Sequence, residues 1–229
     1  MVSPPQTFFD IEHSVLSVFI TGIFVHIPHF VEVLLFACKF PHFGKYRHPH
    51  LDSIYPPPVV YLWSIDQHIH ITGGGGEGSF ATRVPEIQLS QLTTAGTTTV
   101  IGLLGTDGVT RSMENLLAKA RGLEEEGIST WIYSGAYPAD SGHITGTLRS
   151  DIVLIDKILG GKVAMSDHRS SMPSTQAYAS LAAEARIGGM LSGKAGVLHI
   201  HMGDGKRGLE PVLEILETTE LPISVFRPT

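Results

Sequence analysis

Two pairs of histidines, each with its members two residues apart, are the side chains of this chain best suited to chemistry. His68 and His70 stand in the segment IDQHIH, and His199 and His201 stand in VLHIH. On an extended strand, residues i and i+2 point to the same face, so each pair can present two imidazoles to one side of a sheet. Neutral imidazoles are common ligands of Zn²⁺. Such pairs also occur often on protein surfaces, so the spacing alone is weak evidence for a metal site.

A run of glycines follows the first pair and favours the metal-site interpretation. Glycines 73–76 precede Glu77, and no Gly-Lys-Ser/Thr sequence closes the run, which excludes a P-loop for phosphate. Two interpretations of the run itself remain open. Either the glycines form a flexible connection, or their backbone approaches a small ligand closely while Glu77 offers a negative charge to an ammonium group.

Two later segments carry further polar side chains beside predicted strands. Lys162 and Arg169 stand in GKVAMSDHR, where each residue taken alone is most simply a solvated cation. His201 directly precedes the turn sequence Met-Gly-Asp. A lone histidine is usually a hydrogen-bonded core residue, but the place of His201 at the end of an apolar run matches that of the first pair. This match favours metal ligation by His201.

From Ile65 onward, the chain has the pattern of a framework that could position these residues. Short β-rich runs alternate with amphipathic stretches at intervals of about 30 residues, which is typical of βα units and a parallel sheet. The predicted strands are 65–70, 98–104, 130–134, 163–166, 197–201 and 223–226. The predicted helices are 85–95, 113–126, 151–159, 175–191 and 209–217. Glycines just past the predicted helix ends suit left-handed caps: Gly96, Gly127, Gly160 and Gly193.

An open doubly wound sheet and an eight-stranded barrel both fit this alternation, and the polar residues favour the barrel. His68, His70, His201 and Asp204 all lie at or just beyond the carboxyl ends of predicted strands. In barrels, groups from several strand ends converge on that one face. We therefore predict an α/β fold for residues 64–229: a metal-dependent (β/α)8 barrel, truncated after about strand six.

Composition excludes several other classes of protein. The formal net charge is -6, so no basic field attracts nucleic acid or an anionic membrane. The hydrophobic share of 42% and the charged share of 17% are ordinary for a soluble globular chain. Cys38 is the single cysteine, which rules out an intramolecular disulfide and fits a reducing, cytoplasmic location.

Residues 1–63 differ from the rest and form an unassigned, poorly specified N-terminal segment. Their apolar run 15–38 reaches the length of a membrane span. Residues that are costly at mid-bilayer interrupt it: His26, Pro28, His29 and Glu32. A partly disordered segment is therefore the favoured interpretation, with a packed helix or a membrane segment as the alternatives.

Taken together, the motifs resemble those of the isoaspartyl (beta-aspartyl) dipeptidases of the amidohydrolase superfamily. The matching stretches are IDQHIHITGGGGE (65–77), GLLGTD (102–107), GAY (135–137), SDHRS (166–170) and HMGD (201–204). The resemblance runs without gaps from about residue 65 to residue 229. Several motifs in one order are specific, whereas a single His-x-His indicates only the superfamily.

The resemblance implies a barrel with two zinc ions, in a protein that forms homo-oligomers. His68 and His70 would hold the first metal, His201 would bind the second, and Lys162, carboxylated by CO2, would bridge both. A carbamate supplies two oxygen donors and a negative charge, whereas an ammonium group cannot ligate a cation. His199 is left out of this set, because the family pattern places the ligand directly before Met-Gly-Asp.

The implied reaction is hydrolysis of a beta-aspartyl dipeptide by a hydroxide that bridges the metals. Glu77 would meet the α-ammonium group of the substrate, and Arg169 a carboxylate. Tyr137 would lie against the carbonyl oxygen, where negative charge develops. The remaining contacts to the dipeptide would come from Gly75, Gly76 and Thr106.

Two departures from the family pattern qualify this prediction. Residues 1–63 show no similarity to the small β-domain that precedes the first strand in the family. A further metal-ligand histidine and a general-base aspartate would be expected after Thr229, so we expect little or no dipeptidase activity from this chain by itself. The alternatives are a catalytically inactive barrel fragment or a partner-dependent subunit. Another amidohydrolase, such as a dihydroorotase or hydantoinase, is a second alternative, against which the tetraglycine loop and Gly-Ala-Tyr137 argue.

Overall fold

The computed structural model describes residues 64–229. The unassigned segment 1–63, with its apolar run 15–38, lies outside the described residues, so the predictions made for it stay predictions. In the described part of the chain, no helix is both long and apolar enough to cross a membrane.

Six strands form one sheet whose spatial order is the same as their order in the chain. They are β1 (Ser64–Ile69), β2 (Thr97–Gly102), β3 (Ser129–Gly135), β4 (Ile158–Met165), β5 (Val197–Met202) and β6 (Phe226–Pro228). The pairs from β2 to β6 are all parallel. A doubly wound sheet reverses its strand order at a switch point, whereas consecutive barrel strands do not. The α/β prediction is therefore confirmed, with the strand order of part of a barrel.

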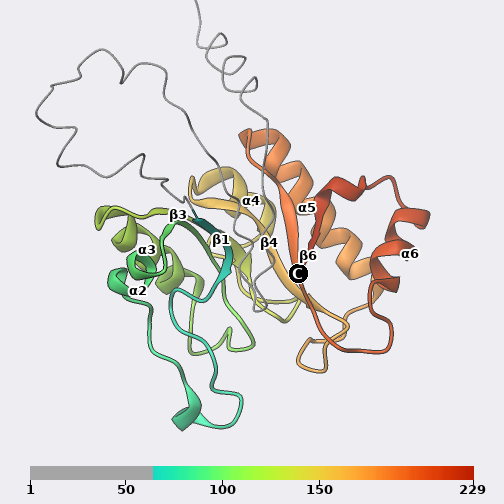
Figure 1. Cartoon of the computed structure of the whole chain (residues 1–229). Helices are drawn as coiled ribbons and strands as arrows, with labels where there is room; N and C mark the ends of the chain where they lie inside the picture. Colours follow the sequence, from blue (N-terminus) through green and yellow to red (C-terminus); the bar gives the residue numbers. More distant parts are fainter. Residues whose placement is uncertain (1–63) are drawn as a thin grey trace, which may run out of the picture. The chain divides into compact units, whose positions relative to one another are not determined.

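Helices follow the strands and flank the sheet (Figure 1). The α-helices are α2 (Leu89–Thr94), α3 (Met113–Glu125), α4 (Leu148–Leu154), α5 (Thr175–Ser192) and α6 (Glu210–Thr218). Two short 3-10 turns are η2 (Phe80–Thr82) and η3 (Ile223–Val225). Helix α4 packs on α5, and α5 covers both β4 and β5.

The two faces of β4 and β5 have different roles. Alternate side chains of both strands are buried against α5 and α6: Val163, Met165, Leu198 and Ile200. The residues between them point to the opposite face, because the side-chain period of a strand is two. Lys162 pairs with His199 in the register of these strands, and Ala164 pairs with His201. The sheet therefore places the lysine and the histidine pair on neighbouring strands of one face.

The fourth helix and strand correct the prediction most. The helix predicted at 151–159 is α4, which begins at Leu148 because Thr147 and Ser150 form a capping box. Gly160, predicted to lie just past that helix, lies inside β4, which begins at Ile158. A Cβ at Gly160 would lie 2.1 Å from the carbonyl oxygen of Val197, so the glycine permits close approach of β5.

Two smaller corrections concern the first predicted helix and the last predicted strand. Only Leu89–Thr94 of the stretch 85–95 is helical, and the side chains of Gln88 and Gln91 cap its start. The strand predicted at 223–226 is a 3-10 turn over Ile223–Val225, and β6 begins only at Phe226.

Asp151 holds the connection between β3 and α4, and its removal is expected to destabilise the fold. Its buried carboxylate accepts hydrogen bonds from Ser134 Oγ at 2.6 Å, from Ile144 N at 3.1 Å and from Thr145 N at 2.7 Å. In D151A these donors lose a charged acceptor, so we expect the free energy of unfolding to fall by about 2–4 kcal/mol in denaturant titrations. The exposed residue Asp140 supplies the control, D140A, which should leave the midpoint unchanged. Equal midpoints for D151A and the parent protein would contradict this expectation.

Candidate active site

The carboxyl ends of β1, β4 and β5 bring together three of the predicted metal ligands and the lysine. His68 lies in β1 and His70 directly follows it, with their ring centroids 5.8 Å apart. The ring of His201, from β5, lies 6.2 Å from that of His68. Lys162 lies in β4, which pairs with β5 in the sheet. The convergence predicted from the strand ends is therefore present in the structure.

Lys162 is a buried amine for which the described residues offer no hydrogen-bond partner. Its residue is 3% exposed, and its Nζ is unpaired among residues 64–229. The ring of Tyr137 lies 5.3 Å from Nζ. Burial lowers the pKa of this amine to about 7, because the charged form loses its hydration. Much of Lys162 is therefore an uncharged, nucleophilic amine at neutral pH, which a solvated lysine is not.

His68 and His70 are held in the neutral form that a metal requires. Burial, followed by the nearby charge of Lys162, lowers the pKa of His68 to about 2 and also lowers that of His70. His70 Nδ1 is buried and has no partner among the described residues. A Cβ at position 105 would lie 2.8 Å from Cε1 of His70, so Gly105 makes room for this ring.

These observations fit a divalent cation, provided that Lys162 takes part. Buried polar atoms without a partner are rare in native proteins and often mark an ion. His70 Nδ1 and Lys162 Nζ are two such atoms in one site. Across residues 64–229, no three side chains of His, Cys, Asp or Glu are arranged to hold a metal by themselves. A metal site built from the described residues would therefore need Lys162 as a further ligand.

His201 has other partners in this structure. Its Nε2 lies 3.0 Å from Oδ2 of Asp167 and 3.2 Å from a terminal nitrogen of Arg169. Its ring stacks on Tyr137 with a centroid distance of 4.6 Å. Burial is the largest cause that lowers the pKa of His201, so this ring too is neutral. Ligation by His201 stays a prediction, and it requires the ring nitrogen to leave Asp167.

A second cluster, beside the histidines, contains the residues predicted to bind a substrate. Glu77 accepts a hydrogen bond from Thr106 Oγ1 at 2.6 Å and pairs with Arg169 at 3.2 Å. The Thr106 hydroxyl is the largest cause that lowers the pKa of Glu77. The guanidinium of Arg169 lies 5.2 Å from the ring of Tyr137. Burial raises the pKa of Tyr137 to about 12, so its phenol keeps its proton and can donate it in a hydrogen bond.

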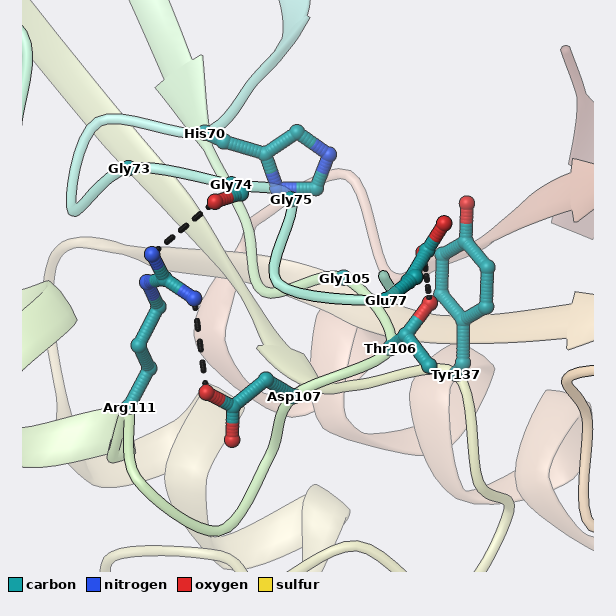
Figure 2. Close-up of a pocket in the computed structure, with 10 residues that line it drawn as sticks. All are labelled: His70, Gly73, Gly74, Gly75, Glu77, Gly105, Thr106, Asp107, Arg111 and Tyr137. Carbon is teal, nitrogen blue, oxygen red and sulfur yellow. Dashed lines mark hydrogen bonds and ion pairs between the residues drawn. The ribbon is translucent and has the colours of Figure 1, made fainter. Parts of the chain in front are cut away.

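A small cavity connects the two clusters (Figure 2). Its volume is about 40 Å³, which is enough for a few water molecules. Figure 2 shows His70 on one side of it and Glu77, Thr106 and Tyr137 on the other. The remaining lining residues are Gly73, Gly74, Gly75, Gly105, Asp107 and Arg111.

The glycine run is an ordered loop held by one buried arginine, which argues against a flexible connection, whereas its close approach to a ligand stays a prediction. Arg111 is 6% exposed and donates hydrogen bonds to the carbonyl oxygens of Thr72 at 3.2 Å, Gly74 at 2.9 Å and Val84 at 3.2 Å. Gly75 and Gly76 have φ values of 63° and 94°, where side chains other than glycine are strained. The loop therefore follows a path that needs glycine, and it carries Glu77 to a fixed place.

Replacing Arg111 with methionine is expected to loosen this loop. The three carbonyl oxygens would lose their charged donor, and each such bond contributes about 1.5–3 kcal/mol. We expect hydrogen exchange of the Val84 amide, which donates to Gly74 O, to become roughly tenfold faster or more. The half-exposed Arg121, with its single ion pair at 3.9 Å, provides the control variant R121M. Unchanged exchange in R111M would show that the loop keeps its path without the arginine.

Sequence reasoning missed Arg111 and Asp167, and it left His199 out of the predicted site. Arg111 carries no motif, and only its burial in the structure marks it. Asp167 precedes His168 in the quoted motif SDHRS, yet only the structure shows its carboxylate between Arg169 and His201. For His199 a signal existed, because the i, i+2 rule that pairs His68 with His70 also places His199 on the face of His201.

Comparison with known proteins indicates what this site resembles. No model of a known protein family matches the chain. Two crystal structures of beta-aspartyl dipeptidase from the thermophilic, keratin-degrading Fervidobacterium islandicum AW-1 do match it. Sequence identity is 54% in both, over 70% and 72% of this chain, with TM-scores of 0.69 and 0.70. This chain is similar to beta-aspartyl dipeptidase.

The similarity confirms the resemblance predicted from the motifs, and it favours beta-aspartyl dipeptidase over the dihydroorotase and hydantoinase alternatives. The second of the two structures contains the dipeptide beta-Asp-Leu. This chain spans 44% of the length of each beta-aspartyl dipeptidase structure, so the match is partial. Metal content and substrate are therefore inferences for this chain.

Proposed function

We propose that this chain contributes the metal-binding and dipeptide-binding face of a zinc-dependent hydrolase of beta-aspartyl dipeptides, built on a (β/α)8 barrel. One observation carries the proposal. Lys162 and His70 have buried, unpartnered nitrogens in a site that also contains the Glu77–Arg169 ion pair. The 54% identity to a beta-aspartyl dipeptidase solved with beta-Asp-Leu supports the choice of substrate.

In this proposal, the metal centre is built from imidazoles and a modified lysine. His68 and His70 would hold the first zinc ion and His201 the second, and carboxylated Lys162 would be a ligand of both. The neutral amine of Lys162 would attack the carbon of CO2, so that a C–N bond forms while one C=O π pair moves onto oxygen, and the nitrogen would lose one proton to solvent water to leave a carbamate. When bound, the metals lower the pKa of a water and polarise the amide carbonyl.

In this proposal, charged side chains bind the two ends of the substrate. Glu77 receives the α-ammonium group, and Arg169 receives a carboxylate through its planar fork. Tyr137, protonated because burial raises its pKa, donates a hydrogen bond where the carbonyl oxygen gains negative charge. Further close contacts come from Gly75, Gly76 and Thr106.

Ligand binding by the purified chain tests this function. After dialysis with zinc and bicarbonate, the chain is titrated calorimetrically with beta-Asp-Leu, and released leucine is measured in the same samples. We expect saturable binding that requires zinc, and at least tenfold weaker binding of the α-linked Asp-Leu. Dihydroorotate serves as the control ligand of another amidohydrolase class. Equal binding of the two Asp-Leu isomers, or binding that is indifferent to zinc, would refute the proposed substrate.

A further inference from the structure

His199 is a buried imidazole that the proposed mechanism does not use. It is 2% exposed and lies in β5, two residues before His201. Its cross-strand neighbour is Lys162, so its ring occupies the layer of the sheet face that contains the proposed bridging lysine. A polar ring in so buried a place is costly unless its nitrogens are used.

Packing fixes the plane of this ring. The ring of His199 stacks on Tyr133, with centroids 4.7 Å apart and planes inclined by 14°. Tyr133 is itself buried and belongs to the inner cluster with Leu103 and Val197. The orientation of His199 is therefore set by the core, before any ligand binds.

The fixed ring points one nitrogen at the first predicted metal ligand. Nε2 of His199 lies 2.9 Å from Nδ1 of His68, and the two ring centroids are 4.9 Å apart. A hydrogen bond between two neutral imidazole nitrogens needs one proton, which belongs either to His68 Nδ1 or to His199 Nε2. The choice decides which nitrogen of His68 is free.

A third group favours the proton on His68. The hydroxyl of Thr229 lies 3.1 Å from the same Nδ1 and donates to the carbonyl oxygen of Ile200 at 3.3 Å. Because the hydroxyl proton is used toward Ile200, its oxygen faces His68 as an acceptor. With the proton on Nδ1 of His68, both neighbours of this nitrogen accept, and Nε2 of His68 keeps its lone pair.

We propose that His199 is a positioning residue for His68. It accepts the Nδ1 proton of His68, selects that tautomer and aims Nε2 of His68 at the cation. This inference rests on the proposed function for the identity of the cation, and on the geometry above for the role of His199. Metal-ligating histidines generally donate their second ring N–H to such a partner, and losing that partner typically lowers metal affinity 10–100-fold.

Two substitutions separate this role from simple packing. H199F keeps an aromatic ring against Tyr133 but removes the acceptor, whereas H199Q keeps an acceptor oxygen at similar reach. We expect zinc affinity, measured by competition with a chromogenic chelator, to fall about 10–100-fold in H199F and to stay within a few-fold of the parent in H199Q. His168, whose side chain is 78% exposed, provides the control H168F, which should bind zinc like the parent.

A second measurement needs no zinc. Long-range ¹H–¹⁵N NMR of the histidine rings in the metal-free protein reports the tautomer of each imidazole. We expect the proton of His68 on Nδ1 in the parent and H199Q, and a mixture of tautomers in H199F. A proton on Nε2 of His68 in the parent, or unchanged zinc affinity in H199F, would overturn the role of His199. Absence of zinc binding by the parent would instead count against the proposed function, while the tautomer still tests His199.

Discussion

Replacing Lys162 with methionine is expected to lower zinc affinity roughly a hundredfold and to abolish any dependence of zinc binding on bicarbonate. Among residues 64–229, no three side chains of His, Cys, Asp or Glu are arranged to hold a metal, so in the proposed site the carbamate of Lys162 would supply a further ligand. A four-ligand zinc site contributes about 10–16 kcal/mol, or roughly 3 kcal/mol for each ligand, which corresponds to a factor of about one hundred. Competition with a chelator, with and without bicarbonate, measures both effects.

Lys157 offers a matched control, because it is also a buried lysine but has partners. Its ammonium pairs with Glu124 and donates to the carbonyl oxygen of Thr130 at 3.1 Å. The variant K157M should therefore keep its bicarbonate-dependent zinc binding, even if its stability falls. Bicarbonate-dependent zinc binding in K162M would show that another group completes the site.

The same lysine gives the metal-free protein an expected pH dependence. Only the neutral amine reacts with CO2, and burial lowers the pKa of Lys162 from 10.5 to about 7. Below pH 7 the ammonium form dominates and the carbamate should be scarce. Above pH 7 the neutral amine dominates, so the ¹³C carbamate signal from labelled bicarbonate should rise between pH 6 and pH 8. A signal that persists in K162M would assign the carbamate to another lysine.

The alternation of strands and helices was predictable, because period-two and helical patterns are local properties of the sequence. The main error, at Gly160 and Gly161, has a non-local cause. Gly160 resembled a helix cap. In the structure, Gly160 and Gly161 instead allow close contacts with Val197 and Leu148, which are distant in the sequence. Glycines have no side chain, so they do not show the period-two pattern by which a strand is recognised, and the start of β4 could not be recognised at these two residues.

The candidate site was predictable to the extent that its residues stand in short motifs. His68, His70 and Glu77 could be selected from spacing, whereas Lys162 taken alone looked like a solvated lysine. Lys162 is buried by residues of the neighbouring strands β3 and β5. These residues are distant in the sequence, so no local pattern could indicate the burial. Arg111 and His199 act through contacts with the loop and with β1, so their roles become visible only in three dimensions.

Replacing Glu77 with glutamine is expected to weaken binding of beta-Asp-Leu about 10–100-fold while leaving zinc affinity unchanged. In the free protein, Glu77 and Arg169 neutralise each other at 3.2 Å beside a cavity of about 40 Å³. In the proposed complex this pair opens, the ammonium group of the dipeptide pairs with Glu77, and its carboxylate pairs with Arg169. Removing the charge of Glu77 forfeits one charge-assisted interaction, about 1.5–3 kcal/mol.

Calorimetry with the zinc-loaded protein measures this loss, and the control is the exposed Glu86, which pairs with Lys119 at 3.5 Å. E86Q should bind the dipeptide like the parent, because Glu86 belongs to neither of the two clusters of the site. In E77Q, an analogue of beta-Asp-Leu without its amino group should bind no more weakly than in the parent, since the lost interaction is with the ammonium. Equal loss for both ligands would mean that Glu77 acts by holding Arg169 or the glycine loop, and that its contact with the substrate ammonium is absent.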